Sequence, residues 1–415
     1  MPEGIQIRDD AVVLGLLMAI LAFVFYTSSS SRAFWKKFYR WVPPLLLCYF
    51  LPSLLSSSGL VDPEQSGLYY LASRFLLPSS LILLTLNIDL KGVFRLGPKA
   101  LVMFFAGTLS VIAGGPLALW LVSFLDPGIA GGEGPEAIWR GMATIAGSWI
   151  GGGANQAAMY EIFKPDDTIF SIMITVDVLV AEIWMAILLI GAARATRIDR
   201  FFRADTSAIT DLRDKMHAFS LRVARIPSLT DVMMILAVAL GFTGLAHLMS
   251  GSIAPWLAEH LPFLERFSLT SEFFWLIVLA TTFGLLLSFT RMRNLEGAGA
   301  SKIGTAFIYI LVATIGLKMD VRHMFSYPTL FFVGLVWMAI HVLTLLIVAR
   351  WIRAPFFYLA VGSKANIGGA ASAPVIAAAF DPALAPVGVL LAVLGYALGT
   401  YGGWLCAVLM QWVAQ

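Results

Sequence analysis

The chain has 415 residues, of which 59% are hydrophobic and only 13% are charged, and its mean hydropathy is +0.84. Soluble proteins carry about a quarter charged residues, so this composition excludes a soluble globular protein and indicates an all-α polytopic membrane protein. The formal net charge of +3 gives no indication of nucleic-acid binding, and we expect the lipid bilayer to surround most of the chain.

The N-terminal segment MPEGIQIRDD lacks the positively charged region of a signal peptide. The apolar run 11–27 is followed by SSSSRAFWKKFYR rather than by a cleavage site, so we expect a retained first helix. The two cysteines, Cys48 and Cys406, lie in apolar runs far apart in the sequence. This spacing indicates neither a metal site nor a disulfide framework.

Twelve stretches are apolar and long enough to predict helices in lipid. In chain order they lie at roughly 11–27, 41–57, 68–88, 99–125, 139–163, 168–193, 231–250, 272–290, 303–319, 328–350, 355–380 and 386–412.

A long polar segment, 194–230, divides these stretches into a first transmembrane repeat, 1–193, and a second, 231–415. Its basic residues predict a cytoplasmic linker that contains a short surface helix. They are Arg194, Arg197, Arg200, Arg203, Arg213, Lys215, Arg222 and Arg225.

Three short motifs recur in the same order in the two halves, which indicates an internal duplication. LNIDLK near 86 matches LKMDVR near 317, GGANQAA (152–158) matches GGAASAP (368–374), and KPDD (164–167) matches DPAL (381–384). The first copy carries a Gly-rich insertion, DPGIAGGEGPEAIW, at 126–139.

The basic clusters predict an orientation, because cytoplasmic loops are rich in Lys and Arg. The clusters at 32–40, 91–99, 291–302 and 350–353 all favour the cytoplasm. LNIDLK then faces inward and LKMDVR outward, so the repeats are inverted. Copies that are six spans apart must nevertheless be parallel if every span crosses. Either one segment between 100 and 193 does not cross fully, or one basic cluster lies on the unexpected side.

The stretch GSWIGGGANQAA (147–158) places three consecutive glycines inside an apolar segment. Each glycine costs a helix interior about 1 kcal/mol, and a broken helix is tolerated in a membrane only inside protein or beside a cavity. Close helix packing through small residues is the alternative, but it does not require Asn155 and Gln156. The second copy, GSKANIGGAASAP (362–374), repeats the break. Glycine-interrupted segments at matching positions of two halves predict a transporter binding site.

Helix ends at the two breaks suggest the chemistry of such a site. We expect Asn155 to cap the second half of 139–163, and Ser372 to cap the second half of 355–380 with Pro374 in its first turn. The N-terminus of a helix attracts anions, and the C-terminus of a helix attracts cations. Lys364 precedes the second break, where its ammonium can occupy the place of a transported cation.

This pattern resembles the cation–proton antiporter and anion transporter superfamily, which includes the bile acid:sodium symporters. GSWIGGGANQAA, followed by a TVD-containing helix, most resembles the domain of unknown function 819 family over nearly the whole chain. The family has no settled activity. The resemblance implies a panel or dimer domain, a core domain with two crossed and broken helices, elevator-like motion and a homodimer.

The antiporters of that superfamily carry acidic residues on the helix after the first broken one. Here Asp177 and Glu182 occupy that helix, TIFSIMITVDVLVAEIWM, with Thr175 nearby. Their spacing places the two carboxylates about 140° apart around the helix, so they need not share one site. Ionisable residues within spans are functional candidates, although an ion pair with Lys364 or Arg74 that locks helices together is the structural alternative.

Other ionisable residues in the spans are more ambiguous. Arg74 can bind an anionic solute or form a structural pair. His247 and His341 stand alone in apolar surroundings, so we expect satisfied core histidines. The residues that we expect to bind the solute or the coupling ion are Ser148, Gly151, Gly152, Gly153, Asn155, Gln156, Thr175, Asp177, Glu182, Ser363, Lys364, Asn366, Gly368, Gly369 and Ser372.

The sequence therefore predicts a multi-pass secondary transporter in the cell (inner) membrane. Its expected solute is small and polar or anionic: an amino acid, a short peptide such as a cell-wall fragment, or an organic acid. Its coupling ion is H⁺ or Na⁺, and the buried lysine and two carboxylates favour H⁺. The alternatives are a cation–proton antiporter and an intramembrane enzyme or sensor scaffold. No P-loop, HExxH, GxSxG or CxxC motif occurs, so we expect neither an enzyme nor a cofactor or bound metal.

Overall fold

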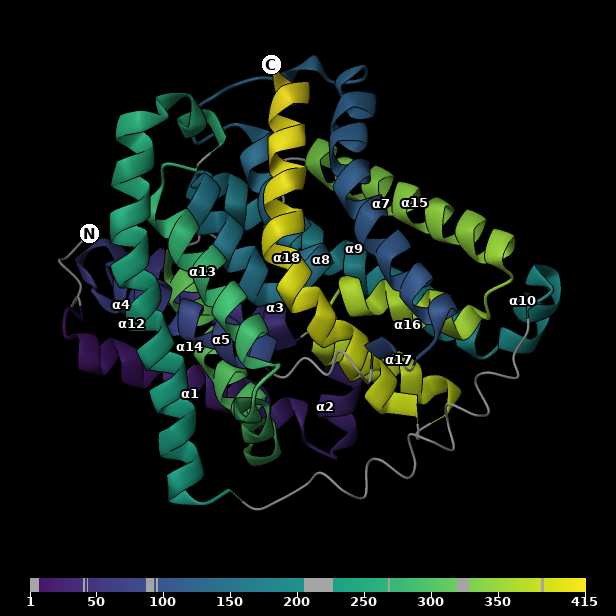
Figure 1. The fold of residues 1–415 in the computed structure, drawn as a ribbon, viewed down its shortest axis with the longest axis horizontal. Helices are drawn as coiled ribbons and strands as arrows, with labels where there is room; N and C mark the ends of the chain where they lie inside the picture. The colour runs from purple at the N-terminus through teal and green to yellow at the C-terminus, as the bar shows by residue number, and fades with distance from the viewer. Residues whose placement is uncertain are drawn as a thin grey trace.

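The computed structural model describes residues 7–39, 42, 44–86, 93–94, 96–204, 227–267, 269–318, 328–381 and 384–415. These residues are almost entirely helical, as Figure 1 shows. The helices are α1 (Asp10–Ser28), α2 (Ala33–Phe38), α3 (Pro44–Ser57), α4 (Leu68–Leu71), α5 (Leu77–Leu86), α7 (Pro98–Ser123), α8 (Ile138–Phe163), α9 (Asp167–Ala192), α10 (Ala195–Phe202), α12 (Leu229–His260), α13 (Glu272–Leu287), α14 (Ala300–Lys318), α15 (Pro328–Ile352), α16 (Phe356–Asn366), α17 (Gly369–Phe380) and α18 (Ala385–Ala414).

Helices lie on all twelve expected stretches, but they are not twelve full spans. In the described part of the chain, eight helices are long and apolar enough to cross a membrane: α1, α4 with α5, α7, α9, α12, α14, α15 and α18. Helix α13 is a ninth if it is counted with the short helix at Arg291–Ala298, which is bent from it by 95°. The chain is thus an all-α multi-pass membrane protein, as its composition predicts.

Helix α8 folds back on itself at the first glycine break. A straight helix of its 26 residues would be about 39 Å long. Instead the rings of Trp139 and Phe163, near its two ends, lie with their centroids 5.8 Å apart. The guanidinium of Arg140 also donates to the Phe163 carbonyl. The chain reverses at Gly152, whose φ of 74° lies outside the helical region. Segment 138–163 is therefore a hairpin whose two ends lie next to each other, on the same side of the protein.

Helices α16 and α17 form a second hairpin. The ring of Phe356, at the start of α16, lies 6.0 Å from that of Phe380, at the end of α17. Two glycines with positive φ, Gly368 and Gly369, turn the chain between them. The carboxylate of Asp199 in α10 accepts the Phe356 amide at 2.7 Å, which fixes the base of this hairpin. Both predicted breaks are confirmed, but the predicted crossing of two spanning helices is wrong, because each break reverses the chain.

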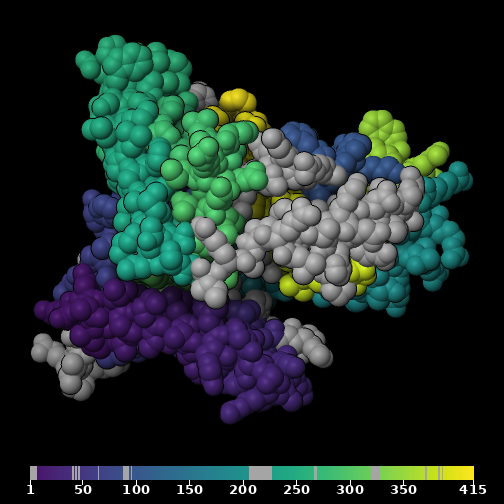
Figure 2. All heavy atoms as spheres, turned by 60° about the horizontal axis from the view of Figure 1, so that its bottom comes forward, coloured from purple at the N-terminus to yellow at the C-terminus, as the bar shows by residue number. Residues whose placement is uncertain are grey.

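The helices pack as two bodies, and each body takes helices from both halves of the sequence. We call α1, α3, α5, α12, α13 and α14, which pack on one another, the scaffold body. We call α7, α8, α9, α15, α16, α17 and α18 the hairpin body. Figure 1 shows the scaffold body on the left and most of the hairpin body on the right, with α18 between them. Figure 2 shows the N-terminal helices α1 and α2, in purple, and α12, in green, on the outside of the molecule.

Some sequence predictions fall outside the described residues. These include most of the LNIDLK and LKMDVR motifs and the four basic linker residues that follow Arg203. Helix α10 begins directly after the linker starts, and it is the only part of the predicted surface helix that lies within the described chain.

The two hairpins generate a labelling prediction. We expect Glu136→Cys and Asp166→Cys, which flank α8, to react with a membrane-impermeant maleimide from the same side of the membrane. The native thiols of Cys48 and Cys406 are buried and give little background. Trp351→Cys and Ala379→Cys, which flank α16 and α17, should likewise share a side. Labelling of the two members of either pair from opposite sides would show that the segment crosses.

Candidate functional site

The tips of the two hairpins meet. A Cβ atom built on Gly369 would lie 4.0 Å from the Cα atom of Gly152. Both tips face the ring of Tyr396 in α18, which would lie 3.4 Å from a Cβ on Gly152 and 3.8 Å from one on Gly369. The prediction that the two breaks come together is confirmed, and Tyr396, which the sequence did not single out, is the side chain between them.

The first tip is also held by close helix packing. A Cβ on Gly151 would lie 2.7 Å from both the Gly395 carbonyl oxygen and the Gly399 Cα of α18. The four-residue spacing of small residues in α18 lets the backbones approach this closely. The packing interpretation therefore explains Gly151, while the chain reversal explains Gly152. Gly153 is half-exposed, and the nearest atom to a Cβ there is 3.9 Å away, on Ile308 of the scaffold body.

Asn155 compensates for the backbone groups that the first break leaves free. Its amide nitrogen donates to the carbonyls of Gly151, at 2.9 Å, and Tyr396, at 3.1 Å. Its carbonyl oxygen accepts from Thr400 at 2.7 Å. The prediction that Asn155 caps a helix start is wrong, because its amide satisfies carbonyls rather than N–H groups. Both of its donors are used, so it fixes the tip.

Asp177 joins the two arms of the first hairpin. This residue of α9 is 4% exposed. It accepts from Trp149 at 2.6 Å, before the turn, and from Gln156 at 2.7 Å, after the turn. Ser148 also lies at this carboxylate. The Gln156 oxygen accepts from Tyr49 of α3 at 3.2 Å, which connects the tip to the scaffold body.

Lys364 and Ser372 lie together at the second tip. A Cβ on Gly368 would collide with the Ser372 hydroxyl and lie 3.3 Å from Nζ of Lys364. Lys364 is 1% exposed and donates to the carbonyl of Ala181 in α9 at 3.2 Å. Within the described chain, the buried Ser372 hydroxyl has no hydrogen-bond partner.

The start of α17 carries no side-chain cap. The helix begins at Gly369 with Gly368 as its N-cap, so Ser372 lies within the first turn rather than before it. The predicted cap is therefore wrong, and Pro374 lies inside the helix. The twelve-residue helix leaves its first N–H groups without a side-chain acceptor. Gly368 is exposed, so the described residues do not cover this end of the helix. An ammonium, a hydroxyl and an uncapped helix start together form an environment that favours an anion.

The two carboxylates of α9 differ in their surroundings. Glu182 is exposed and Asp177 is buried, as their spacing around the helix allows. Both act electrostatically on Lys364, but in the described chain neither lies close enough to form an ion pair with it. Thr175 donates to the carbonyl of Ser171 in its own helix at 3.1 Å.

Ser363 belongs to a chain of hydrogen bonds that fastens the second hairpin. Its hydroxyl accepts from Trp184 of α9 and contacts Nε2 of His341 in α15, both at 2.8 Å. Nδ1 of His341 contacts Ser110 of α7 at 2.6 Å. The Ser363 and His341 side chains are fully buried, and their hydrogen bonds join α16 to α9, α15 and α7. The prediction of a satisfied core histidine is confirmed.

Asn366 is held in a similar way. Its amide nitrogen donates to the carbonyls of Phe104 and Gly362, each at 3.0 Å. Its oxygen accepts from Thr108 at 2.8 Å. Asn366 thus joins α16 to α7 and satisfies its own polar atoms. Of the second copy, only Lys364 and Ser372 keep hydrogen-bonding capacity directed at the tip.

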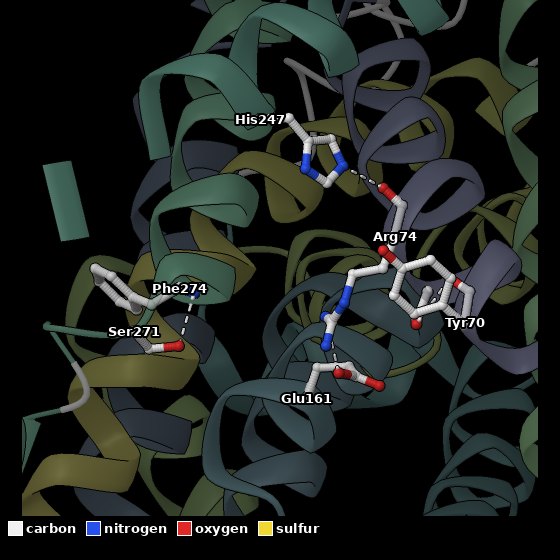
Figure 3. Close-up of polar contacts among 7 residues, drawn as sticks. Tyr70, Arg74, Glu161, His247, Ser271 and Phe274 are labelled. Atoms are coloured by element: carbon white, nitrogen blue, oxygen red, sulfur yellow. Dashed lines mark hydrogen bonds and ion pairs between the residues drawn. The ribbon is translucent and has the colours of Figure 1, made fainter. Parts of the chain in front are cut away.

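Arg74, which the sequence left undecided, is half of an ion pair between the two bodies. It lies 3.1 Å from Glu161 of α8. Glu161 escaped the sequence analysis because it lies near the end of an expected span, where charged residues are common. Nε2 of His247 donates to the Arg74 carbonyl at 2.8 Å, as Figure 3 shows, so this histidine is satisfied as well.

The packing at the first tip generates a stability prediction. In Gly399→Ala the new methyl group would lie 2.5 Å from the Asn155 amide, and such overpacking costs about 1–3 kcal/mol. We therefore expect thermal unfolding of the detergent-purified variant at a lower temperature than wild type. Gly244→Ala in α12 is the control, because nothing lies within 4 Å of a Cβ there. Equal melting temperatures for the two variants would contradict the close packing of α8 on α18.

Comparisons with known proteins agree with this membrane architecture. Over 352 residues, the chain is 23% identical to the uncharacterized membrane protein YjcL of Bacillus subtilis (strain 168). The match covers 83% of this chain and 84% of the relative. Residues 15–413 match a family described as a protein of unknown function, DUF819. Since that match spans nearly the whole sequence, the chain belongs to the DUF819 family.

Proposed function

We propose that this protein is an ion-coupled secondary active transporter whose solute binds between the two hairpin tips. The observation that carries the proposal is the meeting of two glycine-turned hairpins, one from each half of the chain, around Tyr396. Alternating access uses two related halves that surround a shared site, whereas an enzyme needs an active site but no duplicated structure around it. Broken backbone at membrane depth is tolerated where it lines a cavity or is buried in protein.

The hairpins support an inverted topology by removing the conflict in the sequence. If α8 returns to the side it came from, then α9 brings the chain to the cytoplasm at Arg194. In this topology α13 and α3, a helix of only 14 residues, cross in addition to the eight full-length spans. Each half then has five crossing helices and one hairpin, with α1, α3, α5, α7 and α9 matched by α12, α13, α14, α15 and α18. All the basic clusters fall in the cytoplasm, as Lys99, Arg291 and Arg350 illustrate. An odd number of crossings makes the halves antiparallel, so the hairpins approach from opposite sides.

Helix packing follows the same correspondence. Helix α5 packs against α13, and its counterpart α14 packs against α3. Helix α12 contacts α5, and its counterpart α1 contacts α14. These reciprocal pairs are the contacts that a two-fold relation between the halves requires, and they support the inverted repeat.

The second tip favours a solute with a carboxylate group. Lys364 supplies a buried ammonium, Ser372 a hydroxyl that has no partner among the described residues, and α17 an N-terminus without a side-chain cap. Together they offer a charged donor, a neutral donor and backbone N–H groups to one anion. Amino acids, short peptides and organic acids all carry such a group, so these three classes remain the proposed solutes.

Coupling is assigned to the charged groups around Lys364. Its ammonium fills one cation position at the tips, so the coupling ion would instead be a proton that binds to Asp177 or Glu182. Glu182 is exposed, and Asp177 holds both arms of the first hairpin, so protonation of Asp177 would loosen Trp149 and Gln156 together. H⁺ is the proposed coupling ion, Na⁺ the alternative, and a cation–proton antiporter would use the same groups.

Motion of the hairpin body against the scaffold body would expose the tips to each side in turn. Direct polar contacts between the bodies include Tyr49 with Gln156 and Thr281 with Thr400. Helices α1 and α12 of the scaffold have most of their surface uncovered, which suits contact with lipid or with a second copy in a homodimer. The protein would work as a multi-pass transporter of the cell membrane.

Substitutions at the second tip test the solute site. We expect Lys364→Met to abolish uptake of carboxylate solutes into proteoliposomes, because Lys364 is the only buried Lys or Arg among the residues that the structure describes. Ser372→Ala should raise KM about tenfold, since a hydrogen bond to a charged group contributes about 1.5–3 kcal/mol. Ser123→Ala is the matched control, because that hydroxyl is exposed and bonds within α7. The solute is first identified by counterflow with amino acids, peptides and organic acids. Uptake of that solute at the wild-type rate by both tip variants would exclude these residues from the site.

Separate ion gradients test the coupling. Under proton coupling, a pH gradient alone should drive concentrative uptake by wild type. Glu182→Gln or Asp177→Asn should then lose concentrative uptake but keep solute exchange, because exchange needs no net proton movement. Retained exchange also shows that the variant is folded. Uptake that requires a Na⁺ gradient and ignores both substitutions would contradict the proton assignment.

A further inference from the structure

A polar pocket lies away from the hairpin tips. Its volume is about 340 Å³, and it is lined by residues of α4, α12, the start of α13 and the residue that follows α8. Charged and aromatic side chains line it, including Tyr70, Arg74, Lys164, Glu272 and Phe273. Figure 3 shows Arg74 extending between His247 and Glu161, with Tyr70 beside it.

The backbone at Arg74 is held by a histidine because the helix lacks a donor there. Residue 78, four positions later, is Pro78, which has no N–H to give to the Arg74 carbonyl. A π-helical turn occupies Ala72–Leu76, a feature that is frequent at functional sites. Nε2 of His247 in α12 lies 2.8 Å from that carbonyl and, as the only partner with a hydrogen, donates to it. The position of Arg74 is thus set by two helices.

The guanidinium of Arg74 is fixed on one edge and open on the other. Nη1 donates to Glu161 at 3.1 Å, and the guanidinium carbon lies 4.2 Å from the centre of the Phe273 ring. An arginine has five N–H donors, and the described chain supplies an acceptor to only this one nitrogen. The side chain is 26% exposed and lines the pocket, so its remaining donors are available to a ligand.

Charges of both signs face this pocket. Arg74 and Lys164 are cationic, and Glu272, in the first turn of α13, is a carboxylate that acts on Arg74. Beside them, the second oxygen of the buried Glu161 carboxylate has no hydrogen-bond partner within the described chain. The two cations and two carboxylates sum to zero charge. A simple carboxylate would be repelled by Glu272, and a simple amine by Arg74 and Lys164.

We propose that this pocket binds a small zwitterion of the amino-acid type. The ligand carboxylate lies at Arg74 and Lys164, where the open guanidinium edge can hold it through two donors. The ligand ammonium lies at Glu272, so each charge of the ligand meets an opposite charge on the wall. The volume fits a molecule of this size. The inference concerns binding, and it stands whether or not the hairpin tips transport a solute.

Ligand-observed NMR on the detergent-purified protein tests the proposal with three probes: L-alanine, acetate and methylamine. We expect saturable binding of L-alanine and much weaker binding of acetate and methylamine, because each lacks one of the two charges. Glu272→Gln should weaken L-alanine binding about tenfold, a change that corresponds to about 1.4 kcal/mol, without weakening acetate. Lys164→Gln should weaken both L-alanine and acetate.

Two controls separate this pocket from other sites and from unfolding. Lys302→Gln removes an exposed cation elsewhere and should change no affinity. Lys364→Met removes the cation of the hairpin tips, so L-alanine binding that persists in it belongs to the pocket. Residues Glu272 and Lys164 are exposed, so their variants should keep the wild-type melting temperature. No saturable L-alanine binding, equal binding of acetate, or unchanged affinity in both pocket variants would overturn the proposal.

Discussion

A backbone group without a hydrogen bond is costly in lipid, and this constraint governs the arrangement of the whole hairpin body. Two chain reversals inside an apolar protein free N–H and C=O groups at each turn. At the first reversal, the Asn155 amide donates hydrogen bonds to the carbonyl of Gly151 and to that of Tyr396 in α18. Burial of that turn then requires helices that approach closely, which the glycines of α18 permit. The position of Asp177, the packing of α8 on α18 and the place of Tyr396 all follow from the need to close this turn.

The second reversal is closed less completely, and this asymmetry is informative. Its outward-facing bonds, made by Asn366 and by Ser363 with His341, fasten α16 to the neighbouring helices. Its inward side keeps Lys364 with one protein acceptor, Ser372 with none in the described chain, and a helix start without a cap. A fold that satisfies one turn fully and leaves the matching turn with spare donors has a place for an electron-rich group at the second turn. This contrast between the two related tips supports the binding position proposed at the second turn.

The sequence predicted much of this architecture, and its errors have physical causes. Hydropathy located the helices, and the matched glycine motifs predicted that two breaks would meet. The sequence could not show that each break is a reversal, because a glycine permits a positive φ without fixing the bend angle. The caps assigned to Asn155 and Ser372 were wrong because the first residue of a helix depends on that bend. Tyr396 and Glu161 were missed because their roles arise from contacts with residues more than eighty positions away, on which a local pattern carries no information.

The openness at Gly153 has a consequence for selectivity. The two preceding tip positions do not accommodate a side chain: Gly151 lacks the space, and Gly152 has a positive φ. At Gly153, by contrast, the nearest atom to a Cβ would lie 3.9 Å away, on Ile308. This position of the hairpin body therefore faces the scaffold body. Under the motion proposed above, the size of the residue there would set the clearance between the two bodies. Homologues that differ at this position would then differ in the bulk of the solute they accept, while the turn and the lysine stay the same.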